Sequence, residues 1–240
     1  MWWYYLDGDL YIEVNGPLDM TGNLRFDAFA PQDYSYEHLT YPEYAYPWEQ
    51  VKDEIMRVYI AEGCTAIRWR SFCEHKSLRE VSIPKGVTEI DWRAFGYCEN
   101  LENIELPEGL EEITEQAFVG CVSLRHVTIP TSVKVIGKAA FGTCVKLEEL
   151  IIPEGVTEIQ DQAFQGCISL RSLSLPEGLK KIGASAFLPC RNLEKVIIPK
   201  SVQEIGCSAF YNAKKVIAPK SMENIESNVL FGVEEVIYRE

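Results

Sequence analysis

Apolar residues recur along most of this chain with a fixed period of 23 positions. Phenylalanine occupies positions 72, 95, 118, 141, 164, 187 and 210, and proline occupies 84, 107, 130, 153, 176 and 199. Leucine falls at 78, 101, 124, 147, 170 and 193, and cysteine falls at 98, 121, 144, 167 and 190. Four residue types that keep one register over so many turns indicate an internal structural repeat.

The spacing inside one unit predicts a short strand, a bend and a turn. Val127 and Ile129 alternate with polar residues, as in a strand that buries one face. Pro130 ends this strand because it has no backbone N–H to donate. A second extended piece and then a helical turn around Phe141 are expected before Cys144 completes the unit.

One unit of 23 residues cannot bury its own apolar positions, so neighbouring units must bury them together. Stacked units would place their strands about 4.8 Å apart in a parallel sheet. Residues 55–240 hold about eight such coils. We therefore expect an α/β repeat solenoid, with a parallel sheet on one face and a short strand and helical turn on the other.

Residues 1–54 have a different composition and predict an N-terminal, β-rich cap module. They hold eleven Asp or Glu against two Lys or Arg, and 13 of the 27 aromatic residues. WWYYLDGDLYIEV predicts a hairpin that turns at Asp7 and Gly8. The segment 47–55 predicts a short helix with Trp48, Val51, Lys52 and Ile55 on one face.

The repeat resembles the BspA-like class of leucine-rich repeats, most clearly in VTIPTSVKVIGKAAFGTCVKL at residues 127–147. The front of the chain also resembles that family's leader module, in LYIEVNGPL at 10–18 and PWEQVKDEI at 47–55. This resemblance implies a right-handed leucine-rich-repeat solenoid of a bacterial or protist surface, associated with adhesion and with host or glycan contact. It implies a secreted or cell-surface location, although MWWYYLDGDL lacks the basic segment and apolar run of a signal peptide, which leaves a cytoplasmic location open.

Charge narrows the class of partner. The formal net charge is −13, which argues against a nucleic acid or an anionic membrane surface as the partner. No run of about 18 apolar residues is present, so we expect no membrane insertion.

Candidate chemistry is sparse, and we expect neither an enzyme nor a cofactor. Glu158 and Asp161 suggest an acid pair, but Glu158 shares a repeat column with three other glutamates, and repeated acids are typical of a solvated face. There is no G-x-S-x-G, H-E-x-x-H or P-loop pattern.

The eight cysteines favour packing over metal binding. Five share one inward column, Cys64 occupies a core column, and no C-x-x-C occurs. Cys73 and Cys207 lie off the ladder and are the expected reactive thiols. A metal site built from Cys73, His75 and Cys64 is the weaker alternative, because His75 takes the cysteine position of its own rung.

Binding is expected on the outward side of the predicted parallel sheet, which we call the sheet face and which would be concave if the stack curves. Its first rungs are mostly polar, whereas its last three rungs present isoleucine, flanked by Lys195 and Lys215. An exposed apolar strip often marks a contact site. It could instead strengthen the sheet or dock a further domain or second copy. The candidate residues are Tyr59, His126, Ile151, Lys195, Ile197, Lys215, Ile217 and Ile237.

A second candidate is the aromatic segment YSYEHLTYPEYAYPW at 34–48, whose rings could stack on sugars or peptides. Its tyrosines are Tyr34, Tyr36, Tyr41, Tyr44 and Tyr46. The alternative is that this segment only covers the first coil.

These patterns predict a non-enzymatic, adhesion-type repeat protein that binds a surface protein or a glycan on its sheet face. The alternative is a scaffold or spacer domain of a larger surface protein, with no binding site of its own. The sequence leaves the oligomeric state open.

Overall fold

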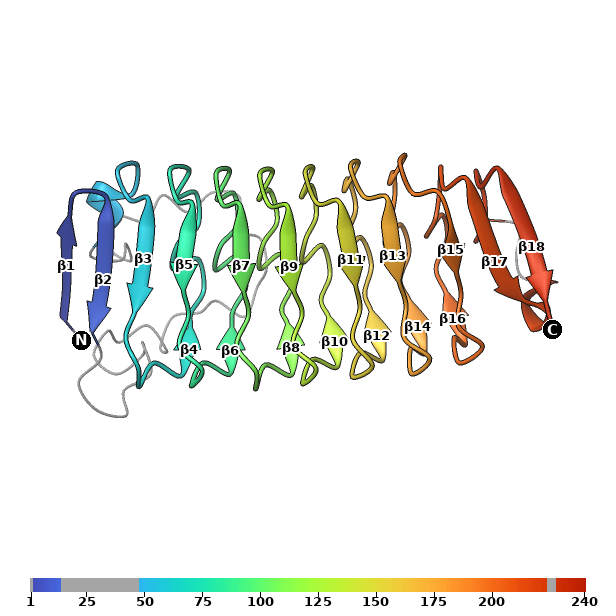
Figure 1. The fold of residues 1–240 in the computed structure, drawn as a ribbon, viewed down its shortest axis with the longest axis horizontal. Helices are drawn as coiled ribbons and strands as arrows, with labels where there is room; N and C mark the ends of the chain where they lie inside the picture. The colour runs from blue at the N-terminus through green and yellow to red at the C-terminus, as the bar shows by residue number, and fades with distance from the viewer. Residues whose placement is uncertain (1, 14–47, 224–227) are drawn as a thin grey trace, which may run out of the picture.

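A computed structural model of the 240-residue chain describes residues 2–13, 48–223 and 228–240. The coils lie side by side along one long axis, and the N- and C-termini lie at opposite ends (Figure 1). The stack is a parallel-strand β-solenoid of about eight turns, as the 23-residue period predicts.

The sheet face carries the longer strands. They begin with the hairpin β1 (Trp2–Leu6) and β2 (Asp9–Glu13), followed by β3 (Arg57–Ile60), β5 (Glu80–Ser82), β7 (Asn103–Glu105), β9 (His126–Thr128), β11 (Glu149–Ile151), β13 (Ser172–Ser174), β15 (Val196–Ile197), β17 (Lys215–Pro219) and β18 (Glu235–Arg239). Hydrogen bonds join these strands in four groups, β1-β2-β3-β5, β7-β9, β11-β13 and β15-β17-β18. All these pairs are parallel except β1 with β2.

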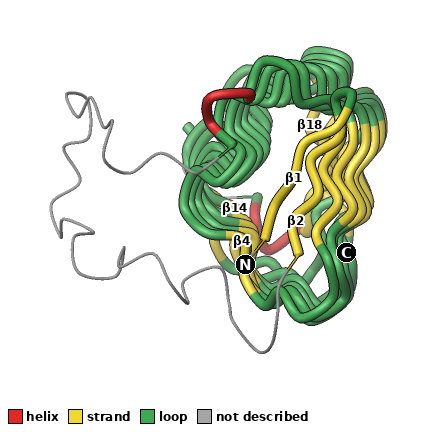
Figure 2. Tube along the Cα trace, turned by 90° about the vertical axis from the view of Figure 1, so that its left-hand side faces the viewer, coloured by secondary structure: helices red, strands yellow, loops and turns green. Residues whose placement is uncertain are grey.

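A second set of two-residue strands lies on another side of the coil (Figure 2). These strands are β4 (Ala66–Ile67), β6 (Glu89–Ile90), β8 (Glu112–Ile113), β10 (Val135–Ile136), β12 (Glu158–Ile159), β14 (Lys181–Ile182) and β16 (Glu204–Ile205). They pair in parallel as β4-β6 and as β8-β10-β12-β14-β16. The repeat therefore aligns both strand sets in register.

The predicted helical turns are not confirmed, so the α/β description does not hold. The described residues contain helix only as two 3-10 turns, η1 (Glu49–Val51) and η2 (Lys220–Met222), and η1 stands where a short α-helix was expected. The segment around each phenylalanine is a series of turns. Arg93 and Tyr97 have φ values of 51° and 60°, and left-handed residues interrupt a right-handed helix.

The turn segments send their backbone hydrogen bonds to the next coil instead. The N–H of Phe141 donates to the carbonyl of Ala163 at 2.8 Å, and the same contact is made by Phe72, Phe95, Phe118, Phe164 and Phe187. Pairing between coils replaces the bonds that a helix would make within itself.

The core is one continuous column of stacked side chains. Seven phenylalanine rings, from Phe72 to Phe210, stack with centroids 5.2–5.4 Å apart and planes within 13°. Trp48 extends this ladder by one ring, 5.6 Å from Phe72, and its indole N–H donates to the carbonyl of Ser71 at 2.9 Å. Trp48 therefore closes the first rung rather than lying on a helix face.

The hairpin at the front of the chain continues the sheet face. Asp7 and Gly8 have φ values of 48° and 92°, and a Cβ on Gly8 would lie 2.3 Å from the Met56 side chain, so the turn requires glycine. β2 pairs in parallel with β3, and Leu10 belongs to the same core as the coils. The hairpin and the coils therefore share one hydrophobic core. The boundary between two modules at residue 54 stays a prediction from composition.

The last coils are shorter than the others. Val196, Val216 and Val236 are register partners at steps of 20 residues. Phe231, which follows Phe210 by 21 residues instead of 23, does not continue the phenylalanine ladder. It is 61% exposed and stacks on Tyr211 at 5.7 Å.

Candidate binding face

Alternation along each strand of the sheet face points one residue outward between two inward ones. The last three strands place Ile197, Ile217 and Ile237 directly opposite one another. Ile197 and Ile237 are 41% and 38% exposed, and Ile217 is half-buried. These three residues, which we call the isoleucine strip, form an in-register apolar row on the outer surface.

Ile151 adds a further apolar side chain on β11, where it is 72% exposed. Its register partner on β13 is Ser174, and Glu149 faces Ser172 in the same way. β13 therefore presents two small side chains outward, whereas the neighbouring strand β11 presents larger ones at the same register.

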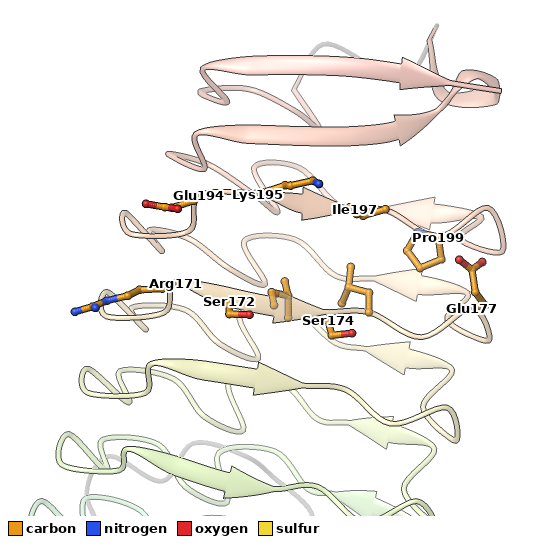
Figure 3. Close-up of a pocket in the computed structure, with 10 residues that line it drawn as sticks. Arg171, Ser172, Ser174, Glu177, Glu194, Lys195, Ile197 and Pro199 are labelled. Atoms are coloured by element: carbon orange, nitrogen blue, oxygen red, sulfur yellow. The ribbon is translucent and has the colours of Figure 1, made fainter.

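A hollow of about 430 Å³ opens at these serines, between β13 and β15 (Figure 3). Its central part is lined by Ser172, Ser174 and Ile197. The inward residues Leu173 and Leu175 also line it, and both are only partly buried. Their counterparts on β11 and β15 are at most 3% exposed, so the hollow reaches the edge of the core. We call this site the serine hollow.

Charged groups surround the serine hollow unevenly. Arg171 and Glu194 lie at one end, and Glu177 lies with Pro199 at the other (Figure 3). Glu194 pairs with Lys214 at 3.6 Å. The two ends of the hollow therefore carry different charged groups, although the protein as a whole is acidic, with a net charge of −13.

The other predicted residues of the sheet face have varied surroundings. His126 and Lys195 are exposed, whereas the Lys215 amine pairs with Glu235 at 2.9 Å. Tyr59 is half-buried and stacks on Tyr11 at 4.9 Å. The structure thus does not bring Tyr59 or His126 into the group formed by the isoleucine strip and the serine hollow.

Tyr11 is a contact that the sequence patterns missed. It lies on β2, next to an ion pair in which Arg57 Nε is 2.6 Å from Asp9 Oδ1. Pairing of β2 with β3 brings these groups together across 48 positions of sequence. The second candidate site, Tyr34, Tyr36, Tyr41, Tyr44 and Tyr46, lies outside the described residues.

A second missed feature is a pair of stacked tryptophans at the turns of the first coils. Trp69 and Trp92 have ring centroids 6.1 Å apart, and the Arg93 guanidinium lies 4.4 Å from the Trp92 ring. The signal was present in the sequence as WRSF and WRAF, 23 positions apart.

The repeated cysteines have a packing role. Cys98 Sγ lies 3.0 Å from the carbonyl oxygen of Phe72 in the preceding coil, and the same contact recurs down the column. Burial raises the pKa of Cys121 and Cys190 to about 12. These thiols therefore act as buried, neutral donors.

Cys73 is not the reactive thiol that its place off the ladder suggested. It is buried, and desolvation raises its pKa. Cys207 is exposed. His75 fills the cysteine position of its rung, edge-on to Phe72 at 5.6 Å, with its Nδ1 3.2 Å from the Cys73 carbonyl oxygen. No group of three potential metal ligands occurs among the described residues.

The acidic residues that first suggested a site make structural contacts. Glu158 pairs with Lys181 at 3.2 Å, and Asp161 accepts a hydrogen bond from the N–H of Ala184 at 2.7 Å. Both contacts join neighbouring coils. Within the described part of the chain, no helix has the length and apolar character needed to cross a membrane.

Stacked coils with regularly spaced leucine, proline and phenylalanine define a leucine-rich-repeat solenoid. The BspA type leucine rich repeat region matches residues 50–169 and 134–236, in six copies. The chain therefore belongs to the BspA type leucine-rich repeat family. Comparison with curated proteins gives no match.

Solved structures of similar proteins share the fold. A T. pallidum leucine rich repeat protein is 34% identical, with a TM-score of 0.60, and the match covers 65% of this chain and 76% of that one. A leucine-rich repeat protein from Bacteroides ovatus is 24% identical, with a TM-score of 0.56, over 78% and 61% of the two chains. The pneumococcal vaccine antigen PcpA is 19% identical, with a TM-score of 0.50, over 78% and 58%. The match thus spans less than two thirds of the last two proteins.

Proposed function

We propose that this chain is a non-enzymatic, adhesion-type binding domain that engages a surface protein or glycan through the C-terminal half of its sheet face. The isoleucine strip carries the proposal. Its three side chains share one register line on adjacent strands, and two of them are more than a third exposed. Exposed apolar rows of this kind mark contact sites on soluble proteins.

The rigidity of the scaffold supports this role. Parallel pairing and a continuous ring ladder fix the outward side chains before any partner arrives. A preformed surface loses little conformational entropy on association, which favours affinity. The acidic net charge also favours a partner other than nucleic acid.

Family membership supports a surface location. The matched protein from pneumococcus is a vaccine antigen. We propose that the present chain is likewise displayed outside the cell, where it would meet proteins and glycans.

The test is a binding screen of the purified chain against a glycan array and a panel of extracellular-matrix and mucin proteins. The same screen is run on the double variant Ile197→Glu/Ile217→Glu. Binding that the folded variant loses supports the proposal. The matched control is Thr128→Glu, a charge placed at the same outward position on β9, away from the isoleucine strip.

Other results would overturn the proposal. Binding that the double variant keeps would move the site to the aromatic segment at 34–48. Absence of binding by the native chain would favour the spacer role instead. Circular dichroism and thermal unfolding of each variant establish that the fold is retained.

A further inference from the structure

We propose that the serine hollow seats an extended peptide segment of a protein partner, with an aliphatic side chain at its centre and an acidic side chain beside Arg171. This inference rests on the proposed function, because it names the chemistry of one ligand for the same face. Three properties of the hollow support it: shape, charge and the kind of side chain that lines it.

The shape follows from the outward residues of one strand. β13 presents Ser172 and Ser174, while β11 presents Glu149 and Ile151 at the same register. Two short side chains leave space for a guest side chain. The space ends on Leu173 and Leu175, whose partial exposure provides an apolar floor. Burial of an aliphatic group there would remove apolar area from water on both partners.

The charges give the hollow a direction. Arg171 lies between two carboxylates that have other partners, since Glu148 pairs with Arg125 and Glu194 pairs with Lys214. Lys195, which precedes β15, is exposed, and its side chain points toward Ile197 rather than toward Arg171 (Figure 3). A carboxylate of the guest would complete this end of the site, because Arg binds carboxylates with two parallel hydrogen bonds.

The far end of the hollow carries a carboxylate, that of Glu177. Glu177 follows Pro176 in the loop after β13 and is exposed. It lies away from Arg171 along the hollow (Figure 3). A basic side chain of the guest would therefore suit this end. In an extended peptide, side chains at i, i+2 and i+4 share one face and rise about 3.3 Å per residue. The matching pattern is acid, any residue, aliphatic, any residue, base.

The lining favours a peptide over a sugar. Its apolar members are two leucines, Ile197 and Pro199, and none of its ten residues is aromatic. Sugar sites commonly present flat aromatic rings, whereas branched aliphatic walls suit an aliphatic side chain. The exposed serine hydroxyls can hydrogen-bond to the backbone of an extended peptide.

The probe is the fluorescein-labelled peptide Gly-Asp-Ser-Leu-Ser-Lys-Gly, and fluorescence anisotropy measures its Kd with the full chain. Two matched peptides replace leucine by alanine or aspartate by lysine. We expect the leucine-to-alanine change to weaken binding about tenfold, as expected for aliphatic groups in apolar pockets. The aspartate-to-lysine peptide should bind more weakly than the parent, with a loss that shrinks in high salt.

The decisive variant is Ser174→Ile, which fills the hollow with the residue that β11 and β15 carry at this position. Isoleucine suits a strand, so the fold should be retained. We expect Ser174→Ile to abolish peptide binding, whereas Ser174→Ala keeps the hollow open, loses only one hydroxyl and should raise Kd by no more than about tenfold. Arg171→Glu should weaken binding of the parent peptide and restore binding of the aspartate-to-lysine peptide.

Ile217→Glu separates this inference from the proposed function, because it alters the isoleucine strip without lining the hollow. Peptide binding should survive Ile217→Glu. No peptide binding by the native chain, or equal binding by Ser174→Ile, would overturn the hollow as a peptide seat. The proposed function would still be decided by the glycan and protein screen with the strip variant.

Discussion

Replacing Phe141 by alanine removes one ring from the middle of the ladder. Phe141 is fully buried and stacks between Phe118 at 5.2 Å and Phe164 at 5.3 Å. Phenylalanine-to-alanine changes in protein cores cost about 3–5 kcal/mol, from lost transfer free energy and from the cavity that remains. Each ring pair adds about 0.5–1.5 kcal/mol beyond its area. We expect Phe141→Ala to lower the free energy of unfolding by an amount in the upper part of this range, about 4–5 kcal/mol.

The measurement is guanidinium unfolding followed by far-UV circular dichroism. An unchanged m-value with a lower midpoint would assign the effect to stability rather than to a change in the exposed area. Hydrogen exchange would show whether the loss spreads along the stack, because neighbouring repeats share their interfaces.

Phe231→Ala is the matched control, because this ring also lies in a turn segment but is 61% exposed at the C-terminal end of the stack. We expect it to lose less than about 1 kcal/mol, since most of the ring already faces water. A loss below about 1 kcal/mol for Phe141→Ala as well would refute the inward ladder and the packing argument built on it.

Three further outcomes follow from the buried groups. Under native conditions a maleimide should label Cys207 and leave the seven buried thiols unreacted, and Cys207→Ser should abolish fast labelling. Trp48→Phe should lower the free energy of unfolding by about 1 kcal/mol, because it removes the hydrogen bond to the Ser71 carbonyl. Trp48→Ala should lower it further, as measured by the same denaturant assay. Burial lowers the pKa of His75, opposed by the hydrogen bond that the ring can donate to the Cys73 carbonyl and by the charge of Glu49. As pH falls, the unfolded chain therefore takes up its proton first. The unfolding free energy should therefore fall below about pH 6.5, and His75→Cys, which restores the residue of the column, should reduce that fall.

The repeat made the stack predictable from sequence. Apolar residues at fixed spacing can be buried only if the coils align, so Phe141 and Cys144 had to face inward. Two-residue alternation in the strands was sufficient to place Ile197 and Ile217 outward. These inferences depend on local periodicity, which a sequence contains in full.

The turns were mispredicted because their hydrogen bonds are not local. Ala140 and Phe141 are spaced as in a helix, yet the left-handed residues of the column are arginine, glutamine, alanine and serine rather than glycine. Nothing in those residue types indicates positive φ. The bonds from Phe141 to Ala163 that stabilise the turn run between coils, and they appear only after stacking.

Some side-chain surroundings were also beyond the sequence. Cys73 was expected to be reactive because it lies off the cysteine column, but it is buried. The step of 21 residues from Phe210 to Phe231 marks a departure from the repeat, but it does not show that Phe231 stacks on Tyr211. The contacts of such an irregular terminal coil depend on the register between β17 and β18, which the structure shows.

In a stack of this kind, the columns serve packing, so a departure at one rung needs a separate cause. Ser174 is less favourable in a strand than the isoleucines that adjacent rungs carry at its position, and Ser172 is smaller than its counterparts Glu149 and Lys195. The same rung leaves Leu173 and Leu175 partly exposed, although Leu150 and Val196 on the flanking strands are almost fully buried. β13 thus forgoes stabilising contacts on both of its faces. A guest side chain that covers the leucines would recover the lost burial, which links the irregularity of this strand to a binding role.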